Sequence, residues 1–534
     1  MKKLKPYILL LCLLLGLLPL HAERVDLEKA EKVAQGYVQS RSKGKSKHNI
    51  RLKYTAAKKR GHSARMGGTS EQDTAYYYVF NVNEEAGGNF VIVAADDAAR
   101  PILGYSENGS YDENNLPPNF VWWMEQIEEQ IAYAQEQNIP QSEDIKKEWE
   151  AYLNGTSTFS ATTVGPLMQT KWGQGPPYNN LCPLDKDQHS RTGCVATAMA
   201  QIMKYHNHPA KGSESSPAYV ASTSKIVVPS VTFDVDYDWG NMLDSYSGTA
   251  TPQQQEAVAP LMYHCGASVK MDYSTNASGA PSSNVPPALK TYFGYDENTR
   301  YTTRNNYTDA QWDALLKEQI DAGLPIYYAS YSTSHGLAHA FVCDGYDGEG
   351  RFHFNWGWSG KDDGYYAISA MNPGINFDFG HEIVVDIKPI SGNLTELHVS
   401  EGTLSPSFRP YIFDYVLQVG SSVESVDITG VTDISGATVT GNVTGLPLSL
   451  NDSISVNIQA TLPGGESQSY RIVVLRSDPS PVVSFTWRID GNMQAISNVT
   501  GFPPPRLSIQ SIGEMVIREP SLRTPITPQV LIRL

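Results

Sequence analysis

The sequence has few charged residues and few cysteines, and both shortages restrict what the protein can be. Of its 534 residues, 18% are charged, and the formal net charge is −15. This acidic balance and the lack of a basic stripe argue against nucleic acid or an anionic membrane surface as a partner. The length exceeds what one hydrophobic core can organise, so we expect two to four domains.

Long hydrophobic runs are also scarce, and the single candidate lies near the N-terminus. Residues 8–18 are apolar apart from Cys12 and Gly16, follow several lysines, and precede LHA at residues 20–22. Because this apolar core is too short to span a bilayer, the pattern predicts a signal peptide over residues 1–22. We therefore expect an exported protein with no membrane span.

Four cysteines remain after the predicted signal peptide: Cys182, Cys194, Cys265 and Cys343. If Cys194 stays free for chemistry, the other three cannot all pair, so a disulfide framework is not expected. Cys265 and Cys343 stand in apolar runs, which favours simple packing in a core.

Changes in composition divide the rest of the chain. Residues 23–160 combine helical and strand patterns and contain no catalytic cluster, and residues 154–158 have the composition of a linker. Residues 161–389 hold all of the candidate chemistry. Residues 390–478 alternate in short segments typical of an antiparallel β-sandwich. The tail, residues 479–534, is too irregular to assign.

Cys194 begins the segment GCVATAMAQIM at residues 193–203, whose apolar residues recur at helical spacing. Unpaired N–H groups at the start of a helix favour the thiolate, which is the reactive form of cysteine. Gly193 allows a tight turn and the close approach of a substrate backbone. Taken alone, Cys194 is as readily a small buried core residue, so its partners decide its role.

His339 lies in a predicted strand at residues 338–344, which turns into a second strand at residues 352–356. Pairing across this turn brings His339 near Asn355, provided that the second strand bulges or bends close to its end. We then expect Asn355 to accept the imidazole N–H and to hold the ring toward the thiol. Trp356 would shield that hydrogen bond from water.

A polar amide precedes the cysteine, in the loop KWGQGPPYN at residues 171–179. Acyl transfer needs donors for the developing oxyanion, and the Gln174 side chain with the Cys194 backbone N–H is the expected pair. Nucleophile, base, orienting group and oxyanion donor together predict a cysteine peptidase. We expect no cofactor and no metal, because a helix-borne histidine pair with a carboxylate ligand is missing.

These motifs, in the order Gln, Cys, His, Asn-Trp, resemble the streptopain family of papain-like cysteine peptidases, as does SVKMDY at residues 268–273. The N-terminal unit is similar to that family's inhibitory propeptide, notably GNFVIV at residues 88–93 and ILGYS at residues 102–106. The resemblance implies an α+β fold, with a papain-like two-subdomain core, an α+β propeptide and a C-terminal all-β sandwich. It also implies protein or peptide substrates, and the chain's own propeptide as an intramolecular inhibitor.

The resemblance implies individual roles as well. Cys194 becomes the nucleophile, His339 the general acid and base, and Gln174 an oxyanion donor. Ser278 and Gly279 fall in the family's substrate-lining loop, and Ala338 stands where a glycine commonly contacts the substrate backbone. These three are the predicted substrate-binding residues.

The C-terminal unit separately resembles bacterial cadherin-like β-sandwich modules, on LTELHVSEGTLSPSF at residues 394–408. Such a module implies no catalysis. It leaves open an alternative in which the protein is a catalytically silent surface adhesin or binding protein. The presence of all four site residues, Cys194, His339, Gln174 and Asn355, favours the enzyme.

Overall fold

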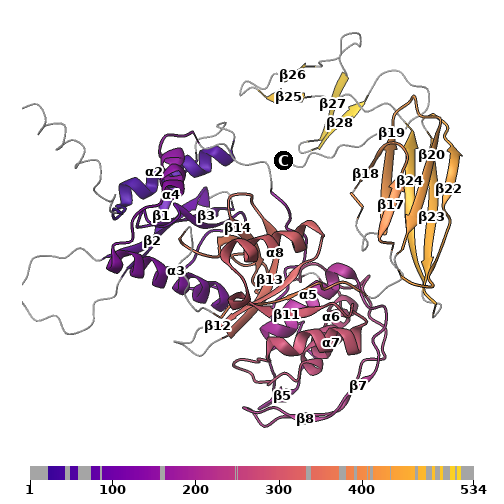
Figure 1. The fold of residues 1–534 in the computed structure, drawn as a ribbon, viewed down its shortest axis with the longest axis horizontal. Coiled ribbons are helices and arrows are strands. Elements are labelled where there is room, and N and C mark those ends of the chain that lie inside the picture. The colour runs from indigo at the N-terminus through magenta and orange to yellow at the C-terminus, as the bar shows by residue number, and fades with distance from the viewer. Residues whose placement is uncertain are drawn as a thin grey trace, which may run out of the picture. The chain divides into compact units, whose positions relative to one another are not determined.

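One antiparallel sheet of ten strands organises the first part of the chain in the computed structural model (Figure 1). The central contact of this sheet joins an early strand to a late one: Tyr105 lies opposite Tyr365, and Gly104 lies opposite Tyr366. Two segments that the sequence predicts as separate units therefore share one sheet. In spatial order the strands are β1 (Ile50–Ala57), β2 (Ala75–Val82), β3 (Asn89–Ala94), β4 (Ile102–Ser106), β15 (Gly364–Ala367), β14 (Arg351–Asn355), β13 (Ala338–Tyr346), β12 (Ile326–Tyr331), β16 (Glu382–Val385) and β11 (Arg300–Thr303).

The chain divides into two units, residues 1–390 and residues 391–534, and each is described separately. Apart from Ala22, the predicted signal peptide lies outside the described residues. The structure describes residues 22–42, 48–57, 74–84, 87–156, 163–246, 248, 250–331, 338–371, 380–389, 394–405, 407–408, 413–432, 434–450, 452–463 and 467–476, and the backbone of four further strands within residues 484–518.

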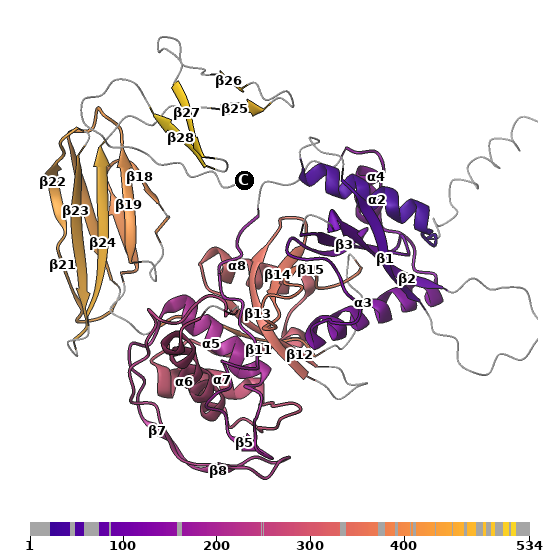
Figure 2. The same ribbon diagram turned by 180° about the vertical axis from the view of Figure 1, so that it is seen from behind.

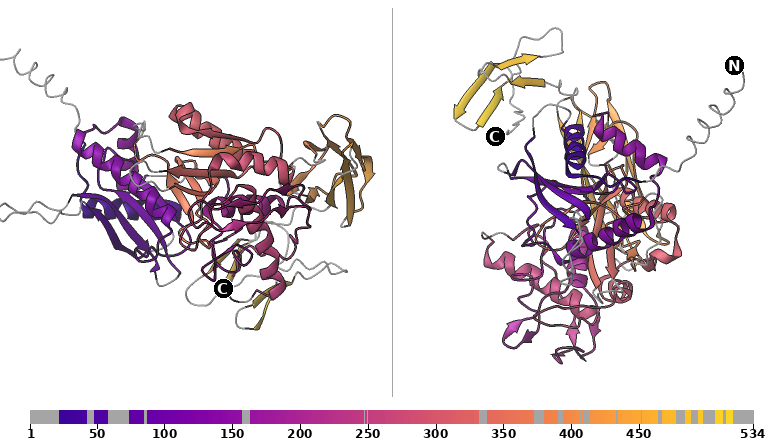
Figure 3. Two further views of the ribbon diagram at one scale, coloured as in Figure 1. Left: turned by 90° about the horizontal axis from the view of Figure 1, so that it is seen from below. Right: turned by 90° about the vertical axis from the view of Figure 1, so that its left-hand side faces the viewer.

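Helices cover both faces of the N-terminal strands. Helices α2 (Leu27–Arg41) and α4 (Glu143–Leu153) pack together on one face, and α3 (Pro118–Gln137) lies on the other (Figures 1 and 3). The starts of α2 and α4 are fixed by side chains, because Asp26 accepts from the Lys29 N–H and Ser142 accepts from the Ile145 N–H. The predicted mixture of helices and strands in this region is confirmed.

The later strands are also covered on both faces. Helices α5 (Cys194–His206), α6 (Pro252–Ser268) and α7 (Val285–Phe293) form one layer, which Figure 2 shows beside β11 and β12. Helix α8 (Asp309–Asp321) packs on the opposite face, in the same hydrophobic core as the N-terminal strands. A mixed helix and sheet architecture results, as the predicted α+β class requires.

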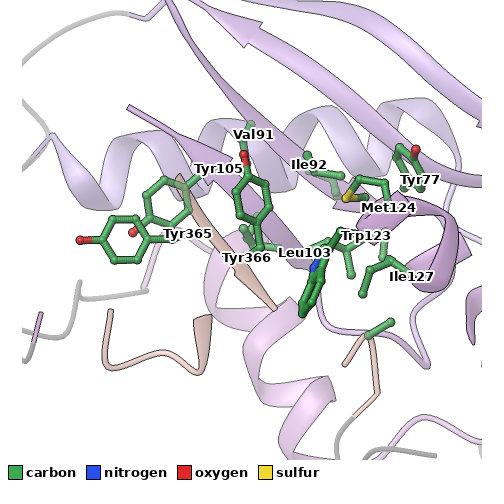
Figure 4. Close-up of a cluster of buried hydrophobic side chains, with 14 of the residues drawn as sticks. Tyr77, Val91, Ile92, Leu103, Tyr105, Trp123, Met124, Ile127, Tyr365 and Tyr366 are labelled. Atoms are coloured by element: carbon green, nitrogen blue, oxygen red, sulfur yellow. The ribbon is translucent and has the colours of Figure 1, made fainter. Parts of the chain in front are cut away.

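Strand β13 separates two hydrophobic cores. Ala340 and Val342 pack with α5, whereas Phe341 and Cys343 pack on the other face with Trp123 of α3. Side chains alternate across a strand, so one strand serves both cores. Figure 4 shows the second core, where tyrosines from β4 and β15 stack with their ring centroids 5.1 Å apart.

The predicted hairpin is confirmed as the antiparallel pair β13 and β14. Val342 lies opposite Asn355, and a register shift follows between Cys343 and Gly345. The bulge thus falls near the start of the hairpin turn. At the far end β14 stops at Asn355, and the chain bends at Gly357, whose φ is +71°.

The second unit is all-β. One hydrophobic core joins a three-stranded sheet and a five-stranded sheet. The strand pairs are antiparallel except β19 with β24, which are parallel, so the prediction of a wholly antiparallel sandwich is wrong at that pair. Parallel pairing sets an early strand of the module directly beside its last strand. The sheets are β17 (Glu396–Val399), β20 (Ser425–Val431) and β22 (Val443–Pro447), and β18 (Thr403–Ser405), β19 (Asp414–Val419), β24 (Ser467–Arg476), β23 (Ser453–Thr461) and β21 (Thr438–Thr440).

Two hairpins follow in the tail that the sequence left unassigned. Strand β25 (Ser484–Trp487) pairs with β26 (Met493–Ile496), and β27 (Arg506–Ser511) pairs with β28 (Glu514–Arg518). Across the described residues of the whole chain, none of the helices has the length and apolar character needed to cross a membrane.

Candidate active site

Cys194 is the first residue of α5, as predicted, and its thiol receives backbone N–H groups. Those of Cys194 itself and of Val195 come from the helix start, and a third comes from Ala340 in β13. Burial raises the pKa of the thiol, and these three N–H groups act against that rise. In this form of the chain the thiol is therefore held mainly in its neutral state, next to donors that suit an anion.

A glycine is required immediately before the cysteine. Gly193 has a φ of +86°, and a Cβ there would lie 2.7 Å from Met271 Sδ and 2.9 Å from the Ser278 carbonyl oxygen. The predicted substrate loop therefore passes directly beside the helix start. The Ser278 side chain turns inward, because its Oγ accepts from the Ser274 N–H and donates to the Ser274 carbonyl. By contrast, the Cα of Gly279 borders open space.

Gln174 is tied to the segment that leads into α5. Its backbone carbonyl accepts from the Thr192 N–H at 3.3 Å, two residues before Cys194. The neighbouring Trp172 is fully buried and donates its indole N–H to the Leu243 carbonyl. The loop that carries Gln174 is thus fixed beside the helix that carries the cysteine.

Asn355 lies on the α5 side of the sheet and is nearly fully buried. Its Nδ2 donates to the Thr170 carbonyl at 2.7 Å. Its Oδ1 accepts from Gln201 Nε2 and from the Gly357 N–H, each at 3.1 Å. The amide is therefore bound to three segments of the chain around α5.

His339 lies opposite Ser330 of β12, in a regular stretch of β13. Burial lowers the pKa of its imidazole. Within the part of the chain that the structure describes, no hydrogen bond joins His339 to Asn355 or to Cys194, so the predicted bond to Asn355 is wrong for this form. The reason is the alternation of side chains along a strand. Asn355 shares a face with Val342, and His339, three residues from Val342, lies on the opposite face.

Trp356 is fully buried in the hydrophobic core that α3 covers. Its indole N–H donates to the Asp362 carbonyl, and its ring packs against Phe341 and against Phe120 of α3. Of Ala338, the structure describes only the backbone, which lies opposite Tyr331. The arrangement brings Cys194, Gln174 and the substrate loop together at the start of α5, and it places Asn355 on the same side of the sheet.

One N-terminal side chain reaches into this region, and no pattern in the sequence predicts it. Asn119 of α3 is fully buried, and its Nδ2 donates to the carbonyls of Ala340 and Trp356, each at 3.0 Å. Its Oδ1 accepts from Trp358 Nε1 at 2.8 Å. Asn119 thus joins the residue after His339 to the segment after β14.

Titratable groups are buried beneath the same N-terminal cover. Asp363 accepts the Trp356 N–H at 2.8 Å, and Ser106 of β4 donates to the Asp363 carbonyl at 2.7 Å. Burial raises the pKa of Asp363 to about 7. His353 lies 2.6 Å from Asp344, and although burial opposes its charged form, that carboxylate raises the pKa of His353.

A buried arginine completes the contact between the two parts. Arg351 of β14 donates to Asp347 at 2.6 Å, and its guanidinium lies over the rings of Tyr37 and Tyr105, 5.6 Å from each centroid. Its carboxylate partner and aromatic cover leave it almost inaccessible. The contact between the N-terminal segment and the later strands therefore buries charge as well as apolar surface.

The structure gives no indication of a metal centre among the residues that it describes. No group of three or more histidine, cysteine or acidic side chains is arranged there to hold an ion. Cys182, Cys265 and Cys343 are free and buried, and Cys194 is free and partly accessible.

Comparison with known proteins gives matches along most of the chain. Residues 172–366 match the profile described as peptidase C10 family, residues 22–131 match the Spi protease inhibitor, and residues 394–477 match a cadherin-like beta sandwich domain. Streptopain from Streptococcus pyogenes is 35% identical over 341 residues, which cover 58% of this chain and 80% of streptopain.

Two further relatives are similar to large parts of the chain. The thiol protease/hemagglutinin PrtT from Porphyromonas gingivalis is 30% identical over 439 residues, covering 79% of this chain and 47% of that protein. A solved structure of a prointerpain A fragment from Prevotella intermedia is 33% identical, with a TM-score of 0.49, and covers 63% of this chain and 99% of its own.

Proposed function

This chain belongs to the peptidase C10 family and is a cysteine peptidase with an inhibitor-like propeptide domain, and we propose that it is a secreted endopeptidase made as a self-inhibited precursor. Residues 23–160 are the propeptide in this proposal, and residues 161–389 are the peptidase domain. The predicted signal peptide, residues 1–22, carries the chain out of the cell. Proteins or peptides are the substrates.

The proposed chemistry is acyl transfer through a thioester. The Cys194 sulfur attacks the carbonyl carbon of the scissile bond, and the Gln174 side chain and the Cys194 N–H bind the resulting oxyanion. His339 takes the thiol proton and gives it to the leaving amine. Water, deprotonated by His339, then hydrolyses the thioester and restores the thiol.

One observation carries this proposal: the strand that bears the histidine touches the nucleophile. Cys194 packs against the core that contains Ala340, the Ala340 N–H acts to lower the pKa of the thiol, and Ala340 is the residue next to His339. A local rearrangement of β13 at His339 is therefore enough to exchange a backbone N–H for an imidazole beside the sulfur. The predicted substrate loop already lies against Gly193.

The inactive state is explained by the propeptide contacts. Asn119 binds the carbonyls of Ala340 and Trp356, and so fixes both strands of the hairpin in the arrangement in which His339 faces away from α5. Release of the propeptide frees these groups. We propose that the chain is cut between about Thr158 and Val164, a stretch of which residues 157–162 lie outside the described residues.

The test compares two cysteine variants of the full-length protein. We expect Cys194→Ala to abolish peptide hydrolysis and to accumulate as the uncut precursor, whereas Cys265→Ala, at a free and buried cysteine, keeps activity and trims itself. Hydrolysis of a fluorogenic peptide and N-terminal sequencing of the trimmed product give the two measurements.

Labelling with an epoxide thiol probe separates the enzyme from the silent adhesin. An enzyme gives labelling that depends on both Cys194 and His339 after the propeptide is removed. Thiol-inhibitor-sensitive hydrolysis that persists in Cys194→Ala would refute the assignment. Cys194 labelling at the same rate in His339→Ala as in wild type would favour a non-catalytic protein whose β-sandwich does the binding.

A further inference from the structure

A glutamine interrupts the apolar surface of the helix that carries the nucleophile. Gln201 follows Cys194 by seven residues, which is about two helical turns and returns to the same side of α5. Its side chain is fully buried. A buried amide is unfavourable unless both of its ends are hydrogen-bonded, so its partners indicate why it is there.

Both ends of the Gln201 amide bind segments of the proposed catalytic machinery. Its Oε1 accepts from the Trp172 N–H at 3.2 Å, and Trp172 lies two residues before Gln174. Its Nε2 donates to Asn355 Oδ1 at 3.1 Å. One side chain on α5 therefore connects the oxyanion loop to the end of β14.

Asn355 extends this connection in two directions. Besides the bond from Gln201, it accepts the Gly357 N–H and donates to the Thr170 carbonyl. The two amides thus form a buried bridge between the helix, the loop before Gln174 and the bend at Gly357. Each amide group has a partner of the right kind, so neither side chain can rotate without leaving a buried group unsatisfied.

We propose that Gln201 is a positioning residue for catalysis. It acts through Asn355 and the Trp172 backbone to hold the Gln174 side chain at the right distance from Cys194. This inference rests on the proposed function, since it assigns a role within that reaction. Gln201 does not contact the reacting atoms. It fixes the distance between the oxyanion donors and the sulfur, on which stabilisation of the tetrahedral intermediate depends.

A positioning role and a purely structural role of Gln201 predict different results for thiol alkylation. Alkylation of the thiol by iodoacetamide requires the thiolate but no oxyanion donors, whereas peptide hydrolysis requires both. Loss of Gln201 should therefore lower the kcat of hydrolysis and leave the rate and pH profile of Cys194 alkylation nearly unchanged. A general collapse of the site would lower both.

The experiment uses the trimmed wild-type enzyme with Gln201→Met, which keeps the volume but removes both polar ends. Met203→Leu, at another fully buried position of α5, is the control for repacking of the helix. We expect Gln201→Met to lower kcat about 10- to 100-fold with little change in KM, and Met203→Leu to stay within about twofold of wild type. Thermal unfolding of both variants checks that each is folded at the assay temperature.

Three results would overturn the inference: hydrolysis by Gln201→Met within twofold of wild type, an equal fall in alkylation, or an equal fall in Met203→Leu. If Gln201→Met does not fold, Gln201→Glu replaces it, because a carboxylate still accepts the Trp172 N–H but cannot donate to Asn355. Failure of the proposed function is a different result, in which the trimmed wild-type enzyme shows neither hydrolysis nor labelling that depends on His339.

Discussion

The two faces of β13 differ in which parts of the chain pack against them. On the α5 face, Ala340 and Val342 pack within the peptidase domain, and the polar contacts of Asn355 and Gln201 are made by residues of that same domain. On the opposite face, α8 of the peptidase domain shares the core with the propeptide, where Phe341 packs against Trp123 and Asn119 binds the Ala340 carbonyl, so only part of these contacts comes from the propeptide.

This difference separates two parts of the catalytic apparatus. The proposed nucleophile Cys194, the proposed oxyanion loop and their buried amides belong to the face that packs within the peptidase domain. By the alternation of side chains along β13, His339 belongs to the face that the propeptide covers in part. We infer that maturation completes the site mainly by changing the environment of His339, while the surroundings of Cys194 are already built.

The largest expected effect tests the histidine side. In the trimmed enzyme, His339→Ala should lower kcat/KM more than about 10³-fold, because general acid and base catalysis and thiolate formation are lost together. Combining it with Cys194→Ala should add little further loss. His353→Ala is the control, since that histidine is bonded to Asp344. Activity in His339→Ala above a few per cent of wild type would assign the proton transfer to another group.

The next largest effect is expected when the contact between Asn119 of the propeptide and the β13–β14 hairpin is removed. Asn119→Ala removes the partners of two carbonyls and one indole N–H, and each buried group left unsatisfied is worth roughly 1–3 kcal/mol. We expect the separately added propeptide domain to inhibit the trimmed enzyme about 100-fold more weakly, and the precursor to process itself sooner.

Asn114→Ala is the matched control for that experiment, because Asn114 is exposed and bonds only to Asp112 among the described residues. Inhibition constants for the two propeptide variants give the comparison. Equal constants would show that Asn119 merely fills space at the interface.

A smaller effect concerns Asn355. Its contacts indicate a framework role, so Asn355→Ala should lower kcat about tenfold and leave the pH profile of Cys194 alkylation in place. An orienting bond to the imidazole in the mature enzyme, which the sequence predicts, would instead shift that profile. The alkylation rate measured from pH 5 to 9 distinguishes the two roles.

The smallest effect is a pH dependence of propeptide release. Burial raises the pKa of Asp363 to about 7 in the precursor, so the neutral acid is favoured there. The neutral Asp363 side chain stabilises the propeptide-bound state. This stabilisation is fully present below the ordinary carboxyl pKa, near 4, and is lost as the pH rises toward 7. Release of the wild-type propeptide should therefore become easier with rising pH relative to Asp363→Asn, by less than about tenfold between pH 6 and pH 7. Parallel curves for the two proteins would contradict this.

Local patterns in the sequence predicted much of this arrangement. Glycine before Cys194 and the apolar spacing after it located the start of α5, and the turn residues after residue 344 predicted the hairpin of β13 and β14. These features depend on residues close together in the chain, where backbone geometry and hydrophobic period act directly.

The remainder depends on contacts between distant segments. Asn119 meets Ala340 across 221 residues, and nothing near Asn119 in the sequence marks it as a hydrogen-bond partner of a strand. The predicted bond between His339 and Asn355 required a bulge or bend near the end of the second strand, whereas the register shift between β13 and β14 lies at the other end, between Cys343 and Gly345. A signal for Gln201 existed: a polar residue amid the apolar residues of a buried helix requires a partner.

The pairing of β4 with β15 has a consequence for the order of events in activation. In the proposed maturation, cutting the linker leaves the two products joined by a shared sheet, by stacked tyrosines and by the cover of Tyr37 and Tyr105 over the buried Arg351. The inhibitor then changes from an attached segment into a separate molecule, and its occupancy follows the law of mass action. Cleavage alone leaves a tight complex at high protein concentration, and dilution or digestion of the propeptide becomes the step that liberates activity. The same protein can thus be silent where it is concentrated and active where it has dispersed.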